Sequence, residues 1–179
     1  MLIRQLTRLD ALVLEEKPLP APYDEALSAA VNGALIEGIR SLGLAALPWD
    51  EAARALQARM EFVRGLGRND LMDWPDSSDE HLMATLEQWL APWLAGITRR
   101  EQLRRVDLPA ALGARLTASQ RRRLEELAPR EFVAPTGSHR QIDYGGDHAP
   151  RVSVRLQEMF GLASTPRVGG GAVPLTFEL

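Results

Sequence analysis

The spacing of apolar residues changes once along this 179-residue chain, at Pro129, and that change restricts the fold more than any other feature. Before Pro129 apolar residues recur every three or four positions, as Leu27, Val31 and Leu35 do, which is typical of helices that bury one face. After Pro129 apolar and polar residues alternate, as they do over 152–156, which is typical of half-buried strands. Helices first and then a small antiparallel sheet predict an α+β fold.

Four or five helices are expected between residues 21 and 130. Four stretches have helical spacing, with a kink expected at Pro92 in the third, and a further short helix is expected to begin near Asp107 and Pro109. Two of the helices open with a capping box, a hydroxyl residue followed three positions later by a glutamate or glutamine: Ser77 with Glu80, and Thr117 with Gln120.

Both ends of the chain are expected to be strands. The run from Leu9 to Leu14 predicts a strand followed by a loop that contains Pro18 and Pro20, and the partner of this strand is expected elsewhere in a longer parent protein. The alternation from Val173 to Leu179 runs to the last residue, which predicts that the natural protein continues. The expected organisation is a strand and linker over 1–20, a helical subdomain over 21–130 and a small β-rich subdomain, truncated at its end, over 131–179.

Composition excludes several classes of site. The chain has no cysteine, so it can form neither a disulfide nor a thiolate metal site. It has no signal-peptide pattern and no apolar stretch of the roughly 20 residues that span a bilayer, so a cytoplasmic protein without a membrane partner is expected. The three histidines His81, His139 and His148 are too scattered to predict a zinc site. The four tryptophans are expected to anchor the core: Trp49, Trp74, Trp89 and Trp93.

Catalytic motifs are missing as well. The phosphate-binding pattern GxxxxGK[ST] does not occur; the one lysine, Lys17, lies in the proline-rich loop, and the glycines at 169–171 are interpreted as a flexible turn. No catalytic residue, metal or bound cofactor is therefore expected. Ser138 beside His139 is a weak sign of a hydrolase, because adjacent strand residues point to opposite faces and cannot form a nucleophile–base pair.

A cluster of arginines is the strongest functional candidate. Residues 98–130 contain nine arginines against four acids, a net charge of +5, whereas residues 1–97 have a net charge of −7. The run Arg121, Arg122 and Arg123 opens a helix, and four further arginines lie about twenty residues earlier. Guanidinium groups suit phosphate oxygens, so RNA contact is one interpretation. The alternatives are a solvated helix face with i,i+4 pairs to Glu125 and Glu126, or a docking surface for an acidic neighbour.

A second candidate surface lies in the β-rich region. The turn at 135–138 offers backbone amides to an anion. A sheet edge with Arg140, Tyr144 and Arg155 is expected to face a nucleic-acid strand, with the Tyr144 ring stacking on a base.

Several separate motifs follow one another along the chain in a specific order. The most specific is LeuGlnGluMetPheGlyLeu at 156–162, followed by ThrProArgVal at 165–168. The others are the amino-terminal run at 9–20, LeuProTrp at 47–49, TrpProAspSerSerAsp at 74–79, TrpLeuAlaProTrpLeuAlaGly at 89–96, LeuAlaPro at 127–129 and the ProThrGlySer turn. Together these motifs resemble the carboxy-terminal region of the HrpB family of bacterial DEAH-box ATP-dependent helicases.

The resemblance implies a parent with two RecA-like domains that hydrolyses ATP with Mg and acts on RNA. None of the family's ATPase motifs has a match in this chain. The chain itself is therefore expected to be a non-catalytic accessory domain whose partner is the helicase core of the same parent chain.

Two roles are open for such a domain. In the first, it contacts or guides single-stranded RNA through Arg121–Arg123 and the Arg140–Tyr144–Arg155 surface. In the second, it is a structural brace that docks on the helicase core without touching RNA. A free-standing hydrolase that uses Ser138 and His139 is a third and weaker hypothesis.

Overall fold

The computed structural model of the protein describes residues 4–9, 12–18, 25–146 and 148–179. Contacts divide the chain into two compact units. The first unit combines Met1–Pro48 with Met83–Leu108, and the second combines Trp49–Leu82 with Pro109–Leu179. The α+β class expected from the sequence is confirmed, since six α-helices and four strand pairs are found in the described part of the chain.

A hairpin opens the first unit. Strands β1 (Arg4–Leu9) and β2 (Leu12–Pro18) pair antiparallel, from Arg4 opposite Pro18 to Leu9 opposite Leu12. The expectation that the first strand pairs outside this chain is therefore wrong, because the segment just before it is already a strand. The connection at residues 10–11 and the end of the expected loop at 19–20 lie outside the described residues.

Helix α1 (Glu25–Leu42) buries the middle of the predicted stripe, with Val31, Leu35 and Ile39 all less than 9% exposed, whereas Leu42, predicted as its last member, is 51% exposed. Gly43, at a φ of 82°, then turns the chain into a 3-10 turn, η1 (Leu44–Ala46). A residue with a side chain adopts that conformation at a cost, so glycine suits this helix end. Arg40 on α1 pairs with Glu87 on α4 (Leu86–Trp89) at 2.6 Å.

The helix expected over residues 77–93 is broken into three pieces. These are α3 (Asp79–Ala84), α4 and the 3-10 helix η3 (Ala91–Leu94), which has Pro92 in its first turn. The predicted capping box at Ser77 is wrong, because the helix begins two residues later and His81 N donates to Ser78 Oγ at 3.3 Å. Ser77 is instead fully buried. A further 3-10 helix, η4 (Arg100–Arg105), follows.

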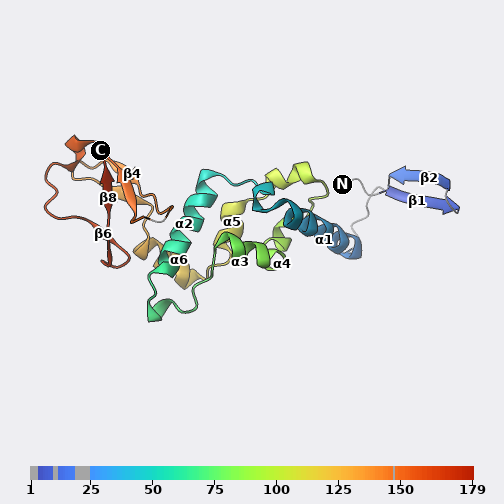
Figure 1. Ribbon diagram of the computed structural model, residues 1–179, viewed down its shortest axis with the longest axis horizontal. Coiled ribbons are helices and arrows are strands. Elements are labelled where there is room, and N and C mark those ends of the chain that lie inside the picture. The colour runs from blue at the N-terminus through green and yellow to red at the C-terminus, as the bar shows by residue number, and fades with distance from the viewer. Residues whose placement is uncertain (1–3, 10–11, 19–24, 147) are drawn as a thin grey trace. The chain divides into compact units, whose positions relative to one another are not determined.

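Three further α-helices belong wholly or mainly to the second unit. Helix α2 (Glu51–Gly65) is capped by Asp50, α5 (Leu108–Gly113) is the predicted short helix, and α6 (Ala118–Leu127) opens with the predicted Thr117–Gln120 capping box. A 3-10 turn, η2 (Asn69–Leu71), follows α2. Helices α2 and α6 lie side by side, as Figure 1 shows. Local signals therefore identified these helix starts correctly.

The strands of the second unit form three short pairs. Strand β3 (Glu131–Val133) pairs antiparallel with β4 (His139–Gln141), and β6 (Arg167–Val168) pairs antiparallel with β7 (Val173–Pro174). Strand β5 (Arg151–Ser153) pairs with β8 (Thr176–Glu178) in parallel, so the expected all-antiparallel sheet is wrong for this pair. The strand expected over 173–179 is split at Leu175, which is 5% exposed.

One core joins the helices of the second unit to its strands. The ring of Tyr144 packs on Phe62 of α2 at 4.9 Å, and Phe132 packs on Phe177 at 5.3 Å. The same core contains Leu127 from α6. The subdomain boundary expected at residue 130 therefore differs from the division of the structure, because α2 and α6 share their core with the strands.

The glycine turn between β6 and β7 fits closely on this core. Gly169 has a φ of 66° and donates its N–H to Leu127 O at 2.7 Å. A Cβ at Gly169 would lie 2.9 Å from Leu66 Cδ2. The turn predicted from the three glycines is therefore present, and the positive φ of Gly169 favours glycine there, while an added Cβ would displace the end of the Leu66 side chain.

Two of the four tryptophans are core residues as expected. Trp74 is 7% exposed and donates its Nε1–H to Met60 O at 2.9 Å, and Trp89 is 5% exposed. Trp49 and Trp93 are only half-buried. The guanidinium of Arg54 lies 3.8 Å from the centre of a Trp49 ring, so this tryptophan contributes a cation–π contact near the surface.

Candidate nucleic-acid interface

The predicted arginine run lies on the first turns of α6. Arg121 and Arg122 are exposed, and Arg123 is half-buried. Arg121 donates its Nε–H to the Gly113 carbonyl at 3.1 Å, which holds it against the turn after α5. Of the three side chains, Arg122 is the one for which the described residues provide no hydrogen-bond or ion-pair partner.

Arg123 is neutralised by two carboxylates. It pairs with Asp70 and, at 3.2 Å, with Glu126. Arg68 and then Arg123 hold the pKa of Asp70 near 2, well below its usual range, and the same carboxylates raise the pKa of Arg123. A phosphate would have to displace these partners to bind Arg123, which makes it a poor anion site.

The i,i+4 pairs considered for α6 are not formed. Glu125 pairs instead with Arg59 at 2.8 Å and with Arg130 at 3.5 Å, while Glu126 pairs with Arg123. Arg122 is left without a carboxylate because each glutamate of the helix has another partner.

Arg140 on β4 is also engaged. Its Nε–H donates to Glu158 Oε2 at 3.0 Å, and Nη2 lies 2.5 Å from Oε1 of the same carboxylate. Glu158 also accepts the backbone N–H of Arg155 at 3.0 Å. These two donors, Arg140 first, hold the pKa of Glu158 near 2. The bidentate pair ties β4 to the segment after β5.

Tyr144 does not offer a ring for stacking on a base, so that part of the predicted surface is wrong. It is 7% exposed, and its hydroxyl donates to Pro129 O at 2.8 Å. Burial raises its pKa, so the hydroxyl stays neutral across the physiological range. Of the three residues predicted for this surface, Arg155 alone has an exposed side chain without a carboxylate partner among the described residues.

The motif LeuGlnGluMetPheGlyLeu includes a short 3-10 helix, η5 (Leu156–Met159). Leu156 is 59% exposed and Phe160 is 68% exposed, whereas Met159 is partly buried on the core. Val133 on β3 is 55% exposed as well. Val133, Leu156 and Phe160 are thus among the large apolar side chains that this unit exposes, together with Met72 and Leu179.

Ser138 and His139 do not interact with each other in the way a nucleophile and base require. The Ser138 hydroxyl lies 3.3 Å from that of Thr136, and Nδ1 of His139 lies 2.8 Å from Glu131 Oε2. The described ranges hold no group of three residues able to ligate a metal ion. Within these ranges no helix combines the length and hydropathy needed to cross a membrane.

The other arginines of the basic segment have a different environment. Arg99, Arg100, Arg104 and Arg105 are exposed, and none has a carboxylate partner in the described part of the chain. They belong to the basic segment of the sequence but are not among the predicted site residues. Their lack of partners could not be read from the sequence, because Glu101 and Asp107 lie at distances along the chain that allow pairing.

This chain is similar in sequence to part of one kind of helicase. Residues 89–179 match the model of the family HrpB_C, described as ATP-dependent helicase C-terminal. The ATP-dependent RNA helicase HrpB of Escherichia coli (strain K12) is 36% identical over 172 residues, which are 96% of this chain and 20% of that protein. The chain thus spans about a fifth of the length of that relative.

Solved structures agree with the sequence match. The crystal structure of the E. coli DExH-box NTPase HrpB matches 98% of this chain with a TM-score of 0.78 at 34% identity, covering 21% of that chain. A second crystal structure, of the Escherichia coli DEAH/RHA helicase HrpB, matches 98% of this chain with a TM-score of 0.76 at 34% identity, covering 22% of that chain.

Proposed function

Since this chain belongs to the HrpB ATP-dependent helicase C-terminal family, we propose that it is a non-catalytic accessory domain that contacts single-stranded RNA. ATP hydrolysis with Mg is assigned to the helicase core of the parent chain, because the motif that would bind the nucleotide's phosphates does not occur here. The core is then the domain's partner, and the cytoplasm its compartment.

One observation carries the RNA proposal. Of the nine arginines in residues 98–130, five are exposed and have neither an ion pair nor a side-chain hydrogen bond with any described residue: Arg99, Arg100, Arg104, Arg105 and Arg122. An exposed guanidinium that no acid neutralises is available to a phosphate oxygen. Arg155 adds a sixth such group on the second unit. The chain as a whole is acidic, so this local excess of unpaired positive charge favours a polyanion as the ligand of these arginines.

The proposal is tested with fluorescence anisotropy of the full 179-residue chain and a labelled single-stranded oligoribonucleotide. Affinity is expected to fall log-linearly with salt concentration, because phosphate contacts release counterions. Arg122→Gln is expected to weaken binding roughly threefold and to lower the salt slope by about one. Arg64→Gln removes the same charge from a residue that pairs with Glu61 at 2.7 Å, so it is the matched control.

The two outcomes of this test are distinct. No binding at 20 mM salt, where surface charges are screened least, would refute the RNA contact. If Arg122→Gln and Arg64→Gln weaken RNA binding equally, Arg122 is not a specific RNA contact. The chain would still bind RNA through other residues.

A structural brace is the second candidate, and the exposed apolar side chains favour it. Val133, Leu156 and Phe160 are each more than half exposed, which is unusual for residues that gain free energy from burial. Under this hypothesis Phe160→Ser weakens association with the separately produced remainder of the full-length protein and leaves RNA affinity unchanged. If Phe160→Ser instead weakens RNA binding and leaves association with the remainder unchanged, Phe160 contacts the RNA.

A further inference from the structure

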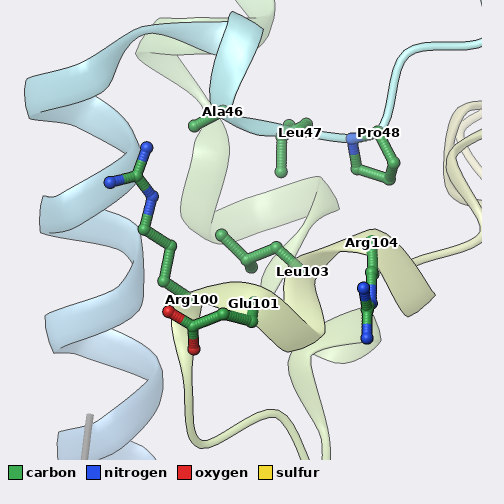
Figure 2. A pocket seen from close by; sticks show the side chains of 7 residues that line it. All are labelled: Ala46, Leu47, Pro48, Arg100, Glu101, Leu103 and Arg104. Carbon is green, nitrogen blue, oxygen red and sulfur yellow. The ribbon is translucent and has the colours of Figure 1, made fainter.

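The first unit contains a hollow of about 420 Å³ beside the 3-10 helix η4. It is lined by Ala46, Leu47, Pro48, Arg100, Glu101, Leu103 and Arg104. Figure 2 shows Arg100 at one side and Arg104 at the other, with Leu103 between them and Leu47 and Pro48 across from η4. Its volume lies within the range of pockets that hold small organic groups, roughly 300–1,000 Å³.

Local structure fixes the walls of this hollow. Gly43 and η1 lead the chain into Leu47, whose N–H donates to Leu44 O at 3.0 Å. On the other wall, Gln102 closes the start of η4, because its Oε1 accepts the backbone N–H groups of Thr98 at 2.8 Å and Arg99 at 3.1 Å. The hollow therefore exists before any ligand arrives.

The apolar floor is equally well held. Leu103 is 3% exposed and Leu47 is 4% exposed. A rigid floor of this kind offers van der Waals contact to a flat or apolar ligand group at little entropic cost.

The two arginines are free to bind an anion. Neither Arg100 nor Arg104 has an ion pair or a side-chain hydrogen bond with any residue in the described ranges, and both are exposed. Arg40 of the same unit is the contrast, because it pairs with both Glu37 and Glu87. Residues four apart in a 3-10 helix lie about 8 Å apart along its axis, so the two guanidinium groups suit successive anionic groups better than a single one.

We propose that this hollow binds single-stranded RNA, with Arg100 and Arg104 on successive phosphates and a sugar or base against Leu47 and Pro48. The inference deepens the proposed RNA contact and rests on it. A nucleotide strand combines regularly spaced anions with flat, partly apolar groups, which matches two free guanidinium groups beside an apolar wall. An acidic protein segment could pair with the two arginines without using the apolar hollow, so the hollow favours RNA as the ligand.

Glu101 is the one acidic residue of the hollow, and Figure 2 shows its carboxylate on the same side as Arg100. It repels a phosphate at short range, so it limits the affinity of the site. Removing its charge is therefore expected to strengthen binding, which is a result that a merely structural role for η4 does not predict.

The test uses the full chain and a labelled oligouridylate in fluorescence anisotropy across a salt series. Arg100→Gln and Arg104→Gln are each expected to weaken binding roughly fivefold near 0.1 M salt, and the double variant is expected to lower the salt slope by about two. Arg40→Gln is the matched control and is expected to change affinity less than twofold. Glu101→Gln is expected to strengthen binding roughly threefold, with Glu80→Gln on α3 as its control.

A second measurement keeps the site testable if the affinity is too low for anisotropy. The Nε–H signals of Arg100 and Arg104 are followed by NMR during titration with the same oligouridylate, and they are expected to shift while that of Arg40 stays in place. If neither signal moves, the hollow is not a phosphate site.

The results separate this inference from the proposed function. If the Arg100 and Arg104 variants bind RNA as well as the Arg40→Gln control does, the hollow is not an RNA site. The proposed RNA contact elsewhere on the chain would still stand. If the Arg100 and Arg104 variants keep their RNA affinity but associate more weakly with the remainder of the full-length protein, the hollow binds an acidic segment of that protein instead of RNA. Circular dichroism melts of each variant exclude unfolding as the cause.

Discussion

Replacing Tyr144 with phenylalanine tests the division between core and surface in the second unit. The hydroxyl donates to Pro129 O at 2.8 Å, and the ring is 7% exposed. Tyr144→Phe keeps the ring and its contact with Phe62 but removes one buried hydrogen bond and leaves the carbonyl without that partner. The expected loss of unfolding free energy is about 1–2 kcal/mol. For a chain of this length that corresponds to a decrease in Tm of about 2–8 °C.

The pH dependence provides an independent check of the same hydroxyl. Burial raises the pKa of Tyr144 in the folded protein, so its stabilising contribution is complete below the unfolded value of about 10 and is lost as pH rises above that value. The chain has one lysine and two tyrosines, so few other groups titrate there. Urea denaturation between pH 8 and pH 11 is expected to show a decline in the wild type that Tyr144→Phe lacks.

Two results would contradict this reasoning. An unchanged Tm in Tyr144→Phe, together with parallel pH profiles, would mean that the hydroxyl is solvated rather than bonded. A Tyr144→Leu variant that keeps its fold but loses RNA affinity severalfold in anisotropy would mean that the ring reaches the RNA after all. The expected result is lower stability with unchanged RNA affinity.

Three other changes test contacts elsewhere in the second unit. Arg59→Met leaves the Ala128 carbonyl without the Nε–H that it accepts at 2.7 Å, and urea denaturation is expected to show a loss of about 2–3 kcal/mol; no loss would mean that water replaces the donor. Arg140→Ala is expected to raise the pKa of Glu158 from about 2 toward its ordinary range near 4.5, and carboxyl NMR would show this shift. In the wild type the pair stabilises the fold above pH 4.5, and this contribution is lost as pH falls through about 2; the variant lacks it. Gly169→Ala adds a Cβ at positive φ against a leucine, and a thermal melt is expected to show a loss of more than about 1 kcal/mol, with an unchanged melt contradicting the tight fit.

Features that depend on neighbouring residues could be predicted from the sequence. The stripe of Val31, Leu35 and Ile39 is buried because helical spacing alone puts these side chains on one face. The Thr117–Gln120 capping box forms because both residues lie within one turn of the helix start. The Ser77 box failed for a related reason, since Ser78 provides an equivalent hydroxyl one position later and Ser77 is needed inside the core.

Features that depend on distant residues could not be predicted in this way. Asp70, which neutralises Arg123, lies 53 residues before it. The partner of β5 is β8, and nothing local distinguishes a parallel from an antiparallel partner for a strand of three residues. Tyr144 shares its strand face with Ile142, so the alternation favours burial, but nothing local indicates that Phe62 of a helix far back in the sequence covers its ring.

The environments of the arginines show why a net charge is an incomplete guide to a binding surface. On α6 the positive charge of Arg123 is cancelled by Asp70 and Glu126, whereas Arg100 and Arg104 on η4 have no such partners in the described chain. Beyond a Debye length of about 10 Å at 0.1 M salt, an RNA strand is insensitive to either group. Within that distance it is attracted only where positive charge is not already paired. In the proposed RNA contact, the arginines without a carboxylate partner are therefore the places at which an acidic domain of this kind would bind phosphates.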